Sequence, residues 1–327
     1  MFNSYRYIIV FCLIMLGAFE QSIANERIDA ILYFQDEKHQ YTIQNIDNPA
    51  IAKLFTEIKR NEINGGFSQA YFWIKIIVPE LPENKNYFLE CSNPHIDLIT
   101  FYQKNKSGGW DSITAGNKFS YNKRVLPYRQ FYFPLSSDKA NFYLLKVKNK
   151  GSLRMKLKLI SQNKIGIKQS YMSLVYGLFF GFIAFIFFYN LILSISLRDI
   201  NYLCFSLFLL ISFFFYASLS GYAFQYLWGS SPFWNQYSIP VFVAGLLASS
   251  AWFTSEFLSL KRLSAKLERV FMIHYIAALF IVILSFLVPY NTAITIAFTI
   301  CLFALLSYLV FGWFAWRNGY TLTRSFI

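Results

Sequence analysis

Charged residues are scarce in this chain. Only 14% of its 327 residues are charged and 56% are hydrophobic, whereas about a quarter of a typical soluble domain is charged. The shortage lies after residue 172, where long apolar runs hold no Asp, Glu, Lys or Arg near their centres. The composition excludes a wholly soluble protein. It also argues against a transporter, because transporters keep ionisable groups or broken helices near the bilayer midplane.

Cysteine and histidine are also rare. Of four cysteines, Cys91 alone lies between the N-terminal leader and the apolar runs; the others are Cys12, Cys204 and Cys301. An intradomain disulfide is therefore excluded in the exported part. His39 and His95 have no carboxylate or cysteine at metal-ligand spacing, so no metal or cofactor is expected. Nucleophile motifs are missing as well, which argues against an enzyme.

Five apolar runs stand out in the second half of the chain. Each approaches the ~20 residues that a helix needs to cross a bilayer. They are predicted helices at Met172–Ser196, Asn201–Ala223, Ser238–Phe257, Val270–Val288 and Thr292–Trp316.

The loops between the runs alternate in charge. Basic residues follow the first, third and fifth runs, at Arg198, at Lys261, Arg262, Lys266 and Arg269, and at Arg317 and Arg324. The two intervening loops hold no Lys or Arg. Because positive loops mark the cytoplasmic side, everything before residue 172 is predicted to lie on the opposite side of the membrane, outside the cytoplasm. A nucleic-acid partner is then excluded, and the arrangement is typical of a receptor.

Residues 1–24 are typical of a secretory signal peptide. Arg6 precedes the apolar stretch Tyr7–Phe19, and a small-residue cleavage pattern ends at Ala24. An uncleaved anchor is the alternative. The exported domain, residues 25–168, is then periplasmic.

Period-2 alternation predicts that the exported domain is all-β. It is clearest where Met155, Leu157 and Leu159 alternate with Lys156 and Lys158. One helix is expected at Pro49–Arg60, and strands at 30–35, 39–44, 70–78, 86–92, 96–103, 110–115, 125–134, 141–148 and 153–160. Many short strands with regular turns favour an antiparallel, jelly-roll-like sandwich, followed by an all-α transmembrane region at 169–327.

The exported domain is also basic, with 22 Lys and Arg against 13 Asp and Glu from Asn25 to Ser170. Such a surface could attract anionic headgroups or an acidic glycan. The favoured interpretation is a solvated face on lysine-rich strands.

The order of short motifs in this domain resembles the extracellular sensor domain of bacterial seven-transmembrane receptors with diverse intracellular signalling modules. The matching pieces are Ala70–Lys75, Phe88–Glu90, Pro94–Tyr102, Gly116, Arg124, Arg129, Phe133–Leu135 and Phe142–Val147. The resemblance implies a β-sandwich that binds a small, carbohydrate-like ligand in the periplasm.

The apolar half resembles the helical region of the same family, on Gly177, Gly181, Tyr189, Asn190, Asp199, Tyr202, Gly221, Trp228, Phe253, Phe257 and Leu258. Residues Arg317 to Arg324 look like the loop to a sixth helix, so about five of seven helices are expected here. In such receptors the last helix leads to a cytoplasmic output domain, often a diguanylate cyclase or a histidine kinase.

Ligand contacts are expected from aromatic faces that stack on sugars and from planar polar groups that bond hydroxyls. The candidates are Tyr102, Trp110, Tyr128 and Tyr132, with Asn93, Asp97, Arg124 and Arg129. Each has a structural alternative: Asp97 could buttress a turn, and the two arginines could pair with Asp111 or Glu90.

Helix packing and signal transmission are assigned to Gly177, Gly181, Asn190 and Gly221. The first two form a small-x-x-x-small pair that lets another helix approach, in this chain or in a homodimer. Asn190 is expected to bridge helices. The alternative function, from another class, is a non-signalling membrane protein that binds envelope polysaccharide or assists its export.

Overall fold

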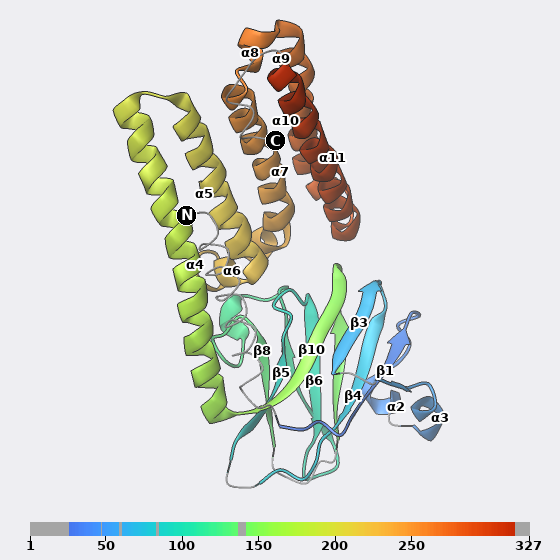
Figure 1. Ribbon diagram of the computed structural model, residues 1–327. Helices are drawn as coiled ribbons and strands as arrows, with labels where there is room; N and C mark the ends of the chain where they lie inside the picture. The colour runs from blue at the N-terminus through green and yellow to red at the C-terminus, as the bar shows by residue number, and fades with distance from the viewer. Residues whose placement is uncertain (1–25, 47, 59–60, 83–84, 137–141, 318–327) are drawn as a thin grey trace.

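A computed structural model describes residues 26–46, 48–58, 61–82, 85–136 and 142–317. The expected signal peptide, with Cys12, and the segment after Arg317 lie outside these residues. A β-sandwich, here called the head (residues 26–161), leads into a group of long helices that extends away from it (Figure 1).

The head consists of two antiparallel sheets. The larger has the strand order β2-β1-β4-β9-β6-β7 and the smaller β3-β10-β5-β8. The strands of the larger sheet are β1 Ala30–Asp36, β2 Thr56–Glu57, β4 Tyr71–Ile77, β6 Leu98–Lys104, β7 Trp110–Ala115 and β9 Phe142–Lys148. Those of the smaller are β3 Glu62–Phe67, β5 Tyr87–Cys91, β8 Phe131–Leu135 and β10 Ser152–Ser161.

The core lies between the two sheets, as the alternation in the sequence predicts. On β10, Met155, Leu157 and Leu159 are buried while Lys156 points to solvent. The ring of Phe101 on β6 stacks on Phe133 of the opposite sheet, with ring centroids 5.2 Å apart. Aromatic packing of this kind stabilises the contact between the two sheets, in which Cys91 is a free thiol.

Three local predictions about the head are wrong. The segment 39–44 is not a strand, because Asp36 accepts hydrogen bonds from the backbone N–H of Gln40 and Tyr41 and turns the chain. Helix α2, Ile43–Ile46, follows it.

The helix expected over Pro49–Arg60 is only α3, Pro49–Ala52. Apolar residues of this stretch, including Ile51 and Phe55, instead pack on the outside of the larger sheet with Trp73. Strand β3 was not expected, and β8 begins only at Phe131, after a short 3-10 helix η1, Tyr121–Lys123.

Within the described residues, five helical segments are long and apolar enough to cross a membrane. They are α4 Gln162–Leu197, α5 Ile200–Ser220, α7 Pro232–Phe257, α9 with α10 over Ala265–Leu287, and α11 Tyr290–Arg317. Helix α9 is Ala265–Phe271 and α10 is Ile273–Leu287; the short helices α6 Tyr222–Tyr226 and α8 Leu260–Leu263 lie in connections. Helix α4 packs on α5, α5 on α7, and α7 on α10 and α11.

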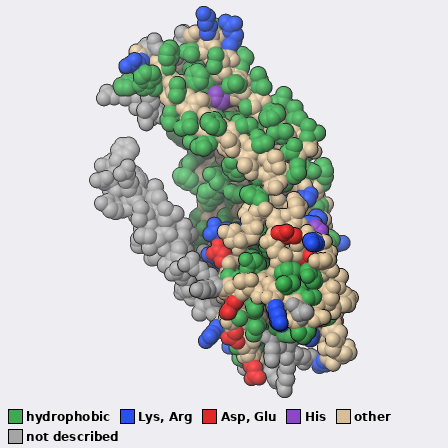
Figure 2. Space-filling view, turned by 90° about the vertical axis from the view of Figure 1, so that its right-hand side faces the viewer, with side chains coloured by type: hydrophobic (Ala, Val, Ile, Leu, Met, Phe, Trp, Pro, Cys, Tyr) green, Lys and Arg blue, Asp and Glu red, His purple; other side chains and the backbone are tan. Residues whose placement is uncertain are grey.

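The two kinds of loop lie at opposite ends of the helices. The uncharged connections near Gly221 and Tyr290 meet the head, and the basic α8–α9 region lies at the far end. In Figure 2, Lys and Arg side chains gather at that far end and on the head, with a largely hydrophobic band between them. Charge is therefore absent where a bilayer would surround the protein on this face.

Candidate functional site

Helix α4 belongs to both parts of the molecule. Its first turns lie along the smaller sheet, where the Lys168 ammonium bonds both carboxylate oxygens of Glu90 on β5, at 2.6 and 2.8 Å. Both side chains are buried. One residue further on, the Gln169 amide donates to the Tyr132 hydroxyl at 2.8 Å. The head is thus joined to the first membrane helix without a linker.

Arg129, just before β8, contacts three helices. Its guanidinium lies over the ring of Tyr176 on α4 and over that of Tyr222 on α6, 4.5 and 5.1 Å from the centroids. It also donates to the carbonyl of Ser220, the last residue of α5, at 3.0 Å. A buried arginine in this position stabilises the docking of head on helices through cation–π and charge-assisted contacts.

Other bonds across the contact between the head and the helices, here called the junction, are accepted by backbone carbonyls. The Tyr121 N–H donates to the Gly229 carbonyl at 2.8 Å, and the Gln225 amide donates to the Pro127 carbonyl at 3.1 Å. Arg124 holds the head side of this surface together, donating to the carbonyls of Tyr128 and Arg129 and to the Asn117 side chain.

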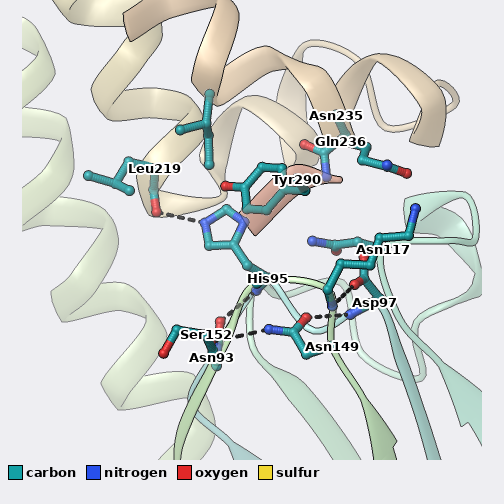
Figure 3. A pocket seen from close by; sticks show the side chains of 13 residues that line it. Asn93, His95, Asp97, Asn117, Asn149, Ser152, Leu219, Asn235, Gln236 and Tyr290 are labelled. Carbon is teal, nitrogen blue, oxygen red and sulfur yellow. Dashed lines mark hydrogen bonds between the residues drawn. The ribbon is translucent and has the colours of Figure 1, made fainter. Parts of the chain in front are cut away.

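A cavity of about 210 Å³, here called the junction cavity, lies between the head and the helices (Figure 3). The lining residues of the head are Asn93, His95, Asp97, Asn117, Asn149, Lys150, Gly151 and Ser152. The helices contribute Leu219 of α5, Asn235, Gln236 and Ile239 of α7, and Tyr290 of α11. This volume lies below the roughly 300–1,000 Å³ of pockets for drug-sized ligands, which fits a smaller molecule.

A hydrogen-bond network fixes the head wall of the junction cavity. The side-chain Oδ1 of Asn93 accepts from the His95 backbone N–H at 2.8 Å, and its Nδ2 donates to the Arg154 backbone carbonyl. Asp97 accepts from the Lys150 N–H through a carboxylate oxygen, while its own N–H donates to Asn149. Preorganised groups of this kind lower the cost of ordering the site on binding.

His95 spans the cavity from head to helix. Its Nε2 donates to the Leu219 carbonyl at 2.8 Å, which fixes the tautomer (Figure 3). Burial lowers the pKa of His95, and the positive charges of Arg124 and Arg129 lower it further, while the carbonyl bond opposes them. The imidazole is therefore neutral at pH 7.

Burial raises the pKa of Asp97, against the opposing effects of the Lys150 N–H and of the Lys150 and Lys118 charges. The cavity thus combines a desolvated carboxyl group, several amides and one aromatic hydroxyl. This set offers both donors and acceptors to a hydroxylated ligand.

Two glycines allow the close approach that forms the cavity. At Gly116 (φ +141°) a Cβ would lie 2.2 Å from the Asp97 carbonyl oxygen. At Gly221 (φ +84°), which ends α5, a Cβ would lie 3.0 Å from Pro94. A side chain at Gly221 would push the head and the helices apart, and one at Gly116 would distort the head wall at Asp97. The positive φ values at both positions also favour glycine.

Of the eight predicted ligand contacts, the structure places Asn93 and Asp97 in the cavity. Arg124, Arg129, Tyr128 and Tyr132 lie elsewhere in the contact between head and helices. Tyr102 and Trp110 lie far from it, on the outer face of the larger sheet. The suggested pairing of the arginines with Glu90 or Asp111 is wrong, since Glu90 binds Lys168 and Asp111 binds Asn105.

The expected helix-packing residues behave differently from one another. Gly221 lies in the junction, but a Cβ at Gly177 or Gly181 would meet nothing within 4 Å. Among the described residues, no helix packs directly on these two glycines, although Gly177 lines a small pocket with Phe213 and Ala217 of α5. The side-chain amide of Asn190 donates to the Ile186 carbonyl of its own helix at 2.8 Å rather than to a neighbouring helix.

Sequence reasoning missed most of the cavity. His95 lies between two of the predicted ligand contacts, Asn93 and Asp97, and was considered only as a metal ligand. The polar pair Asn235 and Gln236, between the uncharged loop and an apolar run, was a usable signal for a residue facing the head. Tyr290 carried no such signal.

Comparison with protein families covers nearly the whole described chain. A model of the 7TM diverse intracellular signalling region matches residues 172–327, and one of the 7TMR-DISM extracellular 2 domain matches residues 29–161. Among curated proteins, none matches the chain. The sandwich, the five apolar helices and these two matches agree, and the chain belongs to the family of seven-transmembrane receptors with diverse intracellular signalling modules.

Proposed function

We propose that this membrane sensory receptor binds a small, carbohydrate-like ligand in the junction cavity and relays binding through its helices to a cytoplasmic output domain. The ligand meets the receptor in the periplasm, at the inner membrane. The cavity carries the proposal, because its walls come from both the head and the helices.

A ligand shifts a conformational equilibrium only if it prefers one state. A molecule that bonds Asn117 on the head and Gln236 on α7 together does so only while the two parts are docked. Binding therefore favours the docked state, in which the ends of α5, α7 and α11 keep fixed positions relative to the head.

The chemistry of the walls favours a polyhydroxylated ligand. Amide side chains offer paired donors and acceptors to neighbouring hydroxyls, and the ring of Tyr290 offers an apolar face. Lys150 and the desolvated carboxyl group of Asp97 add polar partners at the head wall.

The test uses the full chain in lipid nanodiscs, titrated with a panel of neutral mono- and disaccharides. The Trp228 indole donates to Asn235 at 3.3 Å, so a change at the cavity wall alters its contribution to the fluorescence of the chain's seven tryptophans. At least one sugar should change this fluorescence saturably, and Gln236→Ala and Tyr290→Phe should each weaken binding about tenfold, the cost of one lost hydrogen bond.

Tyr226→Phe is the matched control, because Tyr226 lies on α6 at the same junction but does not line the cavity. If no sugar binds, or if the control weakens binding as much as Tyr290→Phe, the proposal fails. Binding that leaves the labelling rate of an Arg198→Cys variant unchanged at the far end would instead favour a non-signalling polysaccharide-binding or export accessory protein.

A further inference from the structure

A second pocket, of about 210 Å³, lies where α4, α5 and α6 meet. Figure 1 shows α6 beside the ends of α4 and α5 that face the head. We call this space the three-helix pocket, and Ser173, Gly177 and Phe180 of α4, Phe213 and Ala217 of α5 and Tyr222 of α6 are among its lining residues. All of its lining residues lie on these helices or directly after α6, so the pocket is separate from the junction cavity.

Small residues open the pocket, and aromatic rings keep it open. Gly177 and Ala217 leave space in the wall, and a Cβ at Gly177 would meet nothing within 4 Å. The ring centroid of Phe180 lies 5.1 Å from that of Phe213 and 6.2 Å from that of Tyr222. Rings that pack on one another do not collapse into the space between them. The pocket also exceeds the roughly 150 Å³ of an apolar cavity that takes up benzene.

The wall of the pocket is polar at one end only. Helix α4 runs away from the head and α5 runs back, so Ser173 and Tyr222 lie near the head while Phe180 and Phe213 lie deeper in the membrane. From Ser173 to Phe180 the helix rises about 10 Å at ~1.5 Å per residue. Hydroxyl groups at the outer boundary and rings in the hydrocarbon match a lipid with its polar end outward and its tail inward. Ser173 and Gly177 are exposed, so the pocket opens toward the bilayer.

A buried cation lies beside the polar end of the pocket. Arg129 donates through Nη1 to the Tyr176 hydroxyl at 3.3 Å, and its guanidinium is 5.1 Å from the ring centroid of Tyr222. Both tyrosines line the pocket. In the part of the chain that the structure describes, Arg129 has no carboxylate partner, and its buried Nε makes no hydrogen bond. An unbalanced positive charge between membrane helices and at the membrane surface attracts an anionic headgroup.

We propose that the three-helix pocket holds one acyl chain of an anionic phospholipid from the outer leaflet, with the headgroup beside Arg129. Lipid tails are as apolar as the wall, so the tail gains only packing contacts there. The headgroup supplies the preference, about fivefold for one arginine. An occupied pocket keeps Tyr176 and Tyr222 in place under Arg129, and the lipid thus stabilises the docking of the head on the helices. This inference does not depend on the proposed function.

The test uses the full chain in phosphatidylcholine nanodiscs with a little phosphatidylglycerol that carries a diazirine in one acyl chain. The same label on phosphatidylcholine is the neutral probe. After photolysis, mass spectrometry of peptides should find the label at Phe180 and Phe213, about fivefold more of it from phosphatidylglycerol. Unlabelled phosphatidylglycerol should compete.

Gly177→Leu should abolish this labelling, because its side chain fills the pocket. Gly181→Leu is the matched control: it lies one turn further along α4, a Cβ there also meets nothing within 4 Å, and Gly181 does not line the pocket. Phosphatidylglycerol should slow exchange of the Tyr121 amide in the parent chain but not in Gly177→Leu. Arg129→Lys should keep the preference for phosphatidylglycerol, and Arg129→Gln should lose it while the neutral probe still labels the pocket.

The proposal is overturned if both leucine variants lose the label equally. It is also overturned if the label spreads without saturation over exposed residues such as Leu178 and Phe182, because general contact with lipid would then explain it. Two further results would assign the pocket to another occupant. Displacement by oleate at lower concentration than by phosphatidylglycerol would indicate a free fatty acid, and a dimer of the parent chain that Gly177→Leu dissociates would indicate a second copy.

Discussion

The ammonium group of Lys168 lies 2.6 Å from one carboxylate oxygen of Glu90 and 2.8 Å from the other, inside the contact between α4 and the smaller sheet. The pair sits beside an apolar cluster of Phe88, Tyr132, Ile160 and Ile165. It fixes the rotation of the helix about its own axis, because apolar packing alone tolerates small changes of register and a two-oxygen ion pair does not.

Removing one partner of this pair should destabilise the head strongly. Glu90→Gln leaves the Lys168 charge buried and is expected to lower the free energy of unfolding by about 3–5 kcal/mol, as measured by pulse proteolysis of the full chain. Glu62→Gln, in a largely exposed pair, should cost about 1 kcal/mol or less. Equal losses would contradict the assignment, and Glu90→Leu/Lys168→Met should recover most of the stability.

Acid should weaken the docking of the head on the helices. An undocked His95 takes up a proton near its ordinary pKa of 6.5, but the docked residue, with its lowered pKa, does not. Docking is therefore unaffected above that pH and weakens as the pH falls through it, by up to about tenfold per unit. Asp97, whose pKa is raised, acts in the opposite direction.

Hydrogen exchange at the Tyr121 amide, which donates to Gly229 across the junction, measures this effect once corrected for intrinsic rates. The pH dependence should be smaller in His95→Gln and unchanged in His39→Gln. Protection that stays constant from pH 8 to about pH 5 in the parent protein would rule out His95 as the source.

Gly221→Ala should loosen the junction. The new Cβ would sit 3.0 Å from Pro94 in a left-handed backbone conformation, which costs roughly 1–2 kcal/mol for residues other than glycine. The Tyr121 amide should then exchange faster. Gly177→Ala serves as the control, because its Cβ would meet open space in the middle of α4; an equal effect there would mean that the junction is not the cause.

The head and the α8–α9 region should label from opposite sides of the membrane. A membrane-impermeant maleimide should modify Ser107→Cys in intact spheroplasts, and Lys266→Cys only after permeabilisation, because both side chains are exposed at opposite ends of the molecule. Background labelling of the parent chain should be low, since Cys91 and Cys204 are buried and the half-buried Cys301 lies in the middle of the apolar helix α11. The opposite labelling pattern would invert the topology.

Much of the helical region could be predicted from sequence, because the cost of charge in lipid leaves a strong signal. The helix ends were less accessible. Helix α4 begins at Gln162, ten residues before the apolar run at Met172, since its first turns pack on the head and need only one apolar stripe. Helix α7 begins at Pro232 rather than Ser238 for a similar reason, because it caps the junction cavity.

In the head, period-2 alternation predicted the strands that have one buried and one solvent-exposed face. It did not predict the segments that depart from this pattern. The spacing of Ile51 and Phe55 gave a helical pattern over Pro49–Arg60, but these side chains are apolar because they pack over Trp73. Strand β3 escaped notice because Gly65 and Gly66 interrupt its pattern; a Cβ at Gly65 would collide with the Phe72 ring.

The candidate site was only partly predictable, because long-range docking creates it. Asn93 and Asp97 could be chosen for their chemistry, but their partners Asn235 and Tyr290 lie more than a hundred positions away on other helices. No local pattern encodes which loop meets which helix end. Family resemblance pointed to the head alone, whereas the geometry puts the cavity at its base.

The uninterrupted course of α4 has a mechanical consequence. Its 36 residues form one rod about 54 Å long at 1.5 Å per residue, clamped to the smaller sheet at one end. A tilt of only about 5° at the clamp would swing the opposite tip by about 5 Å, close to one helical pitch. Small rotations of α4 where it packs on the sheet would thus produce larger displacements at its opposite end, near Arg198.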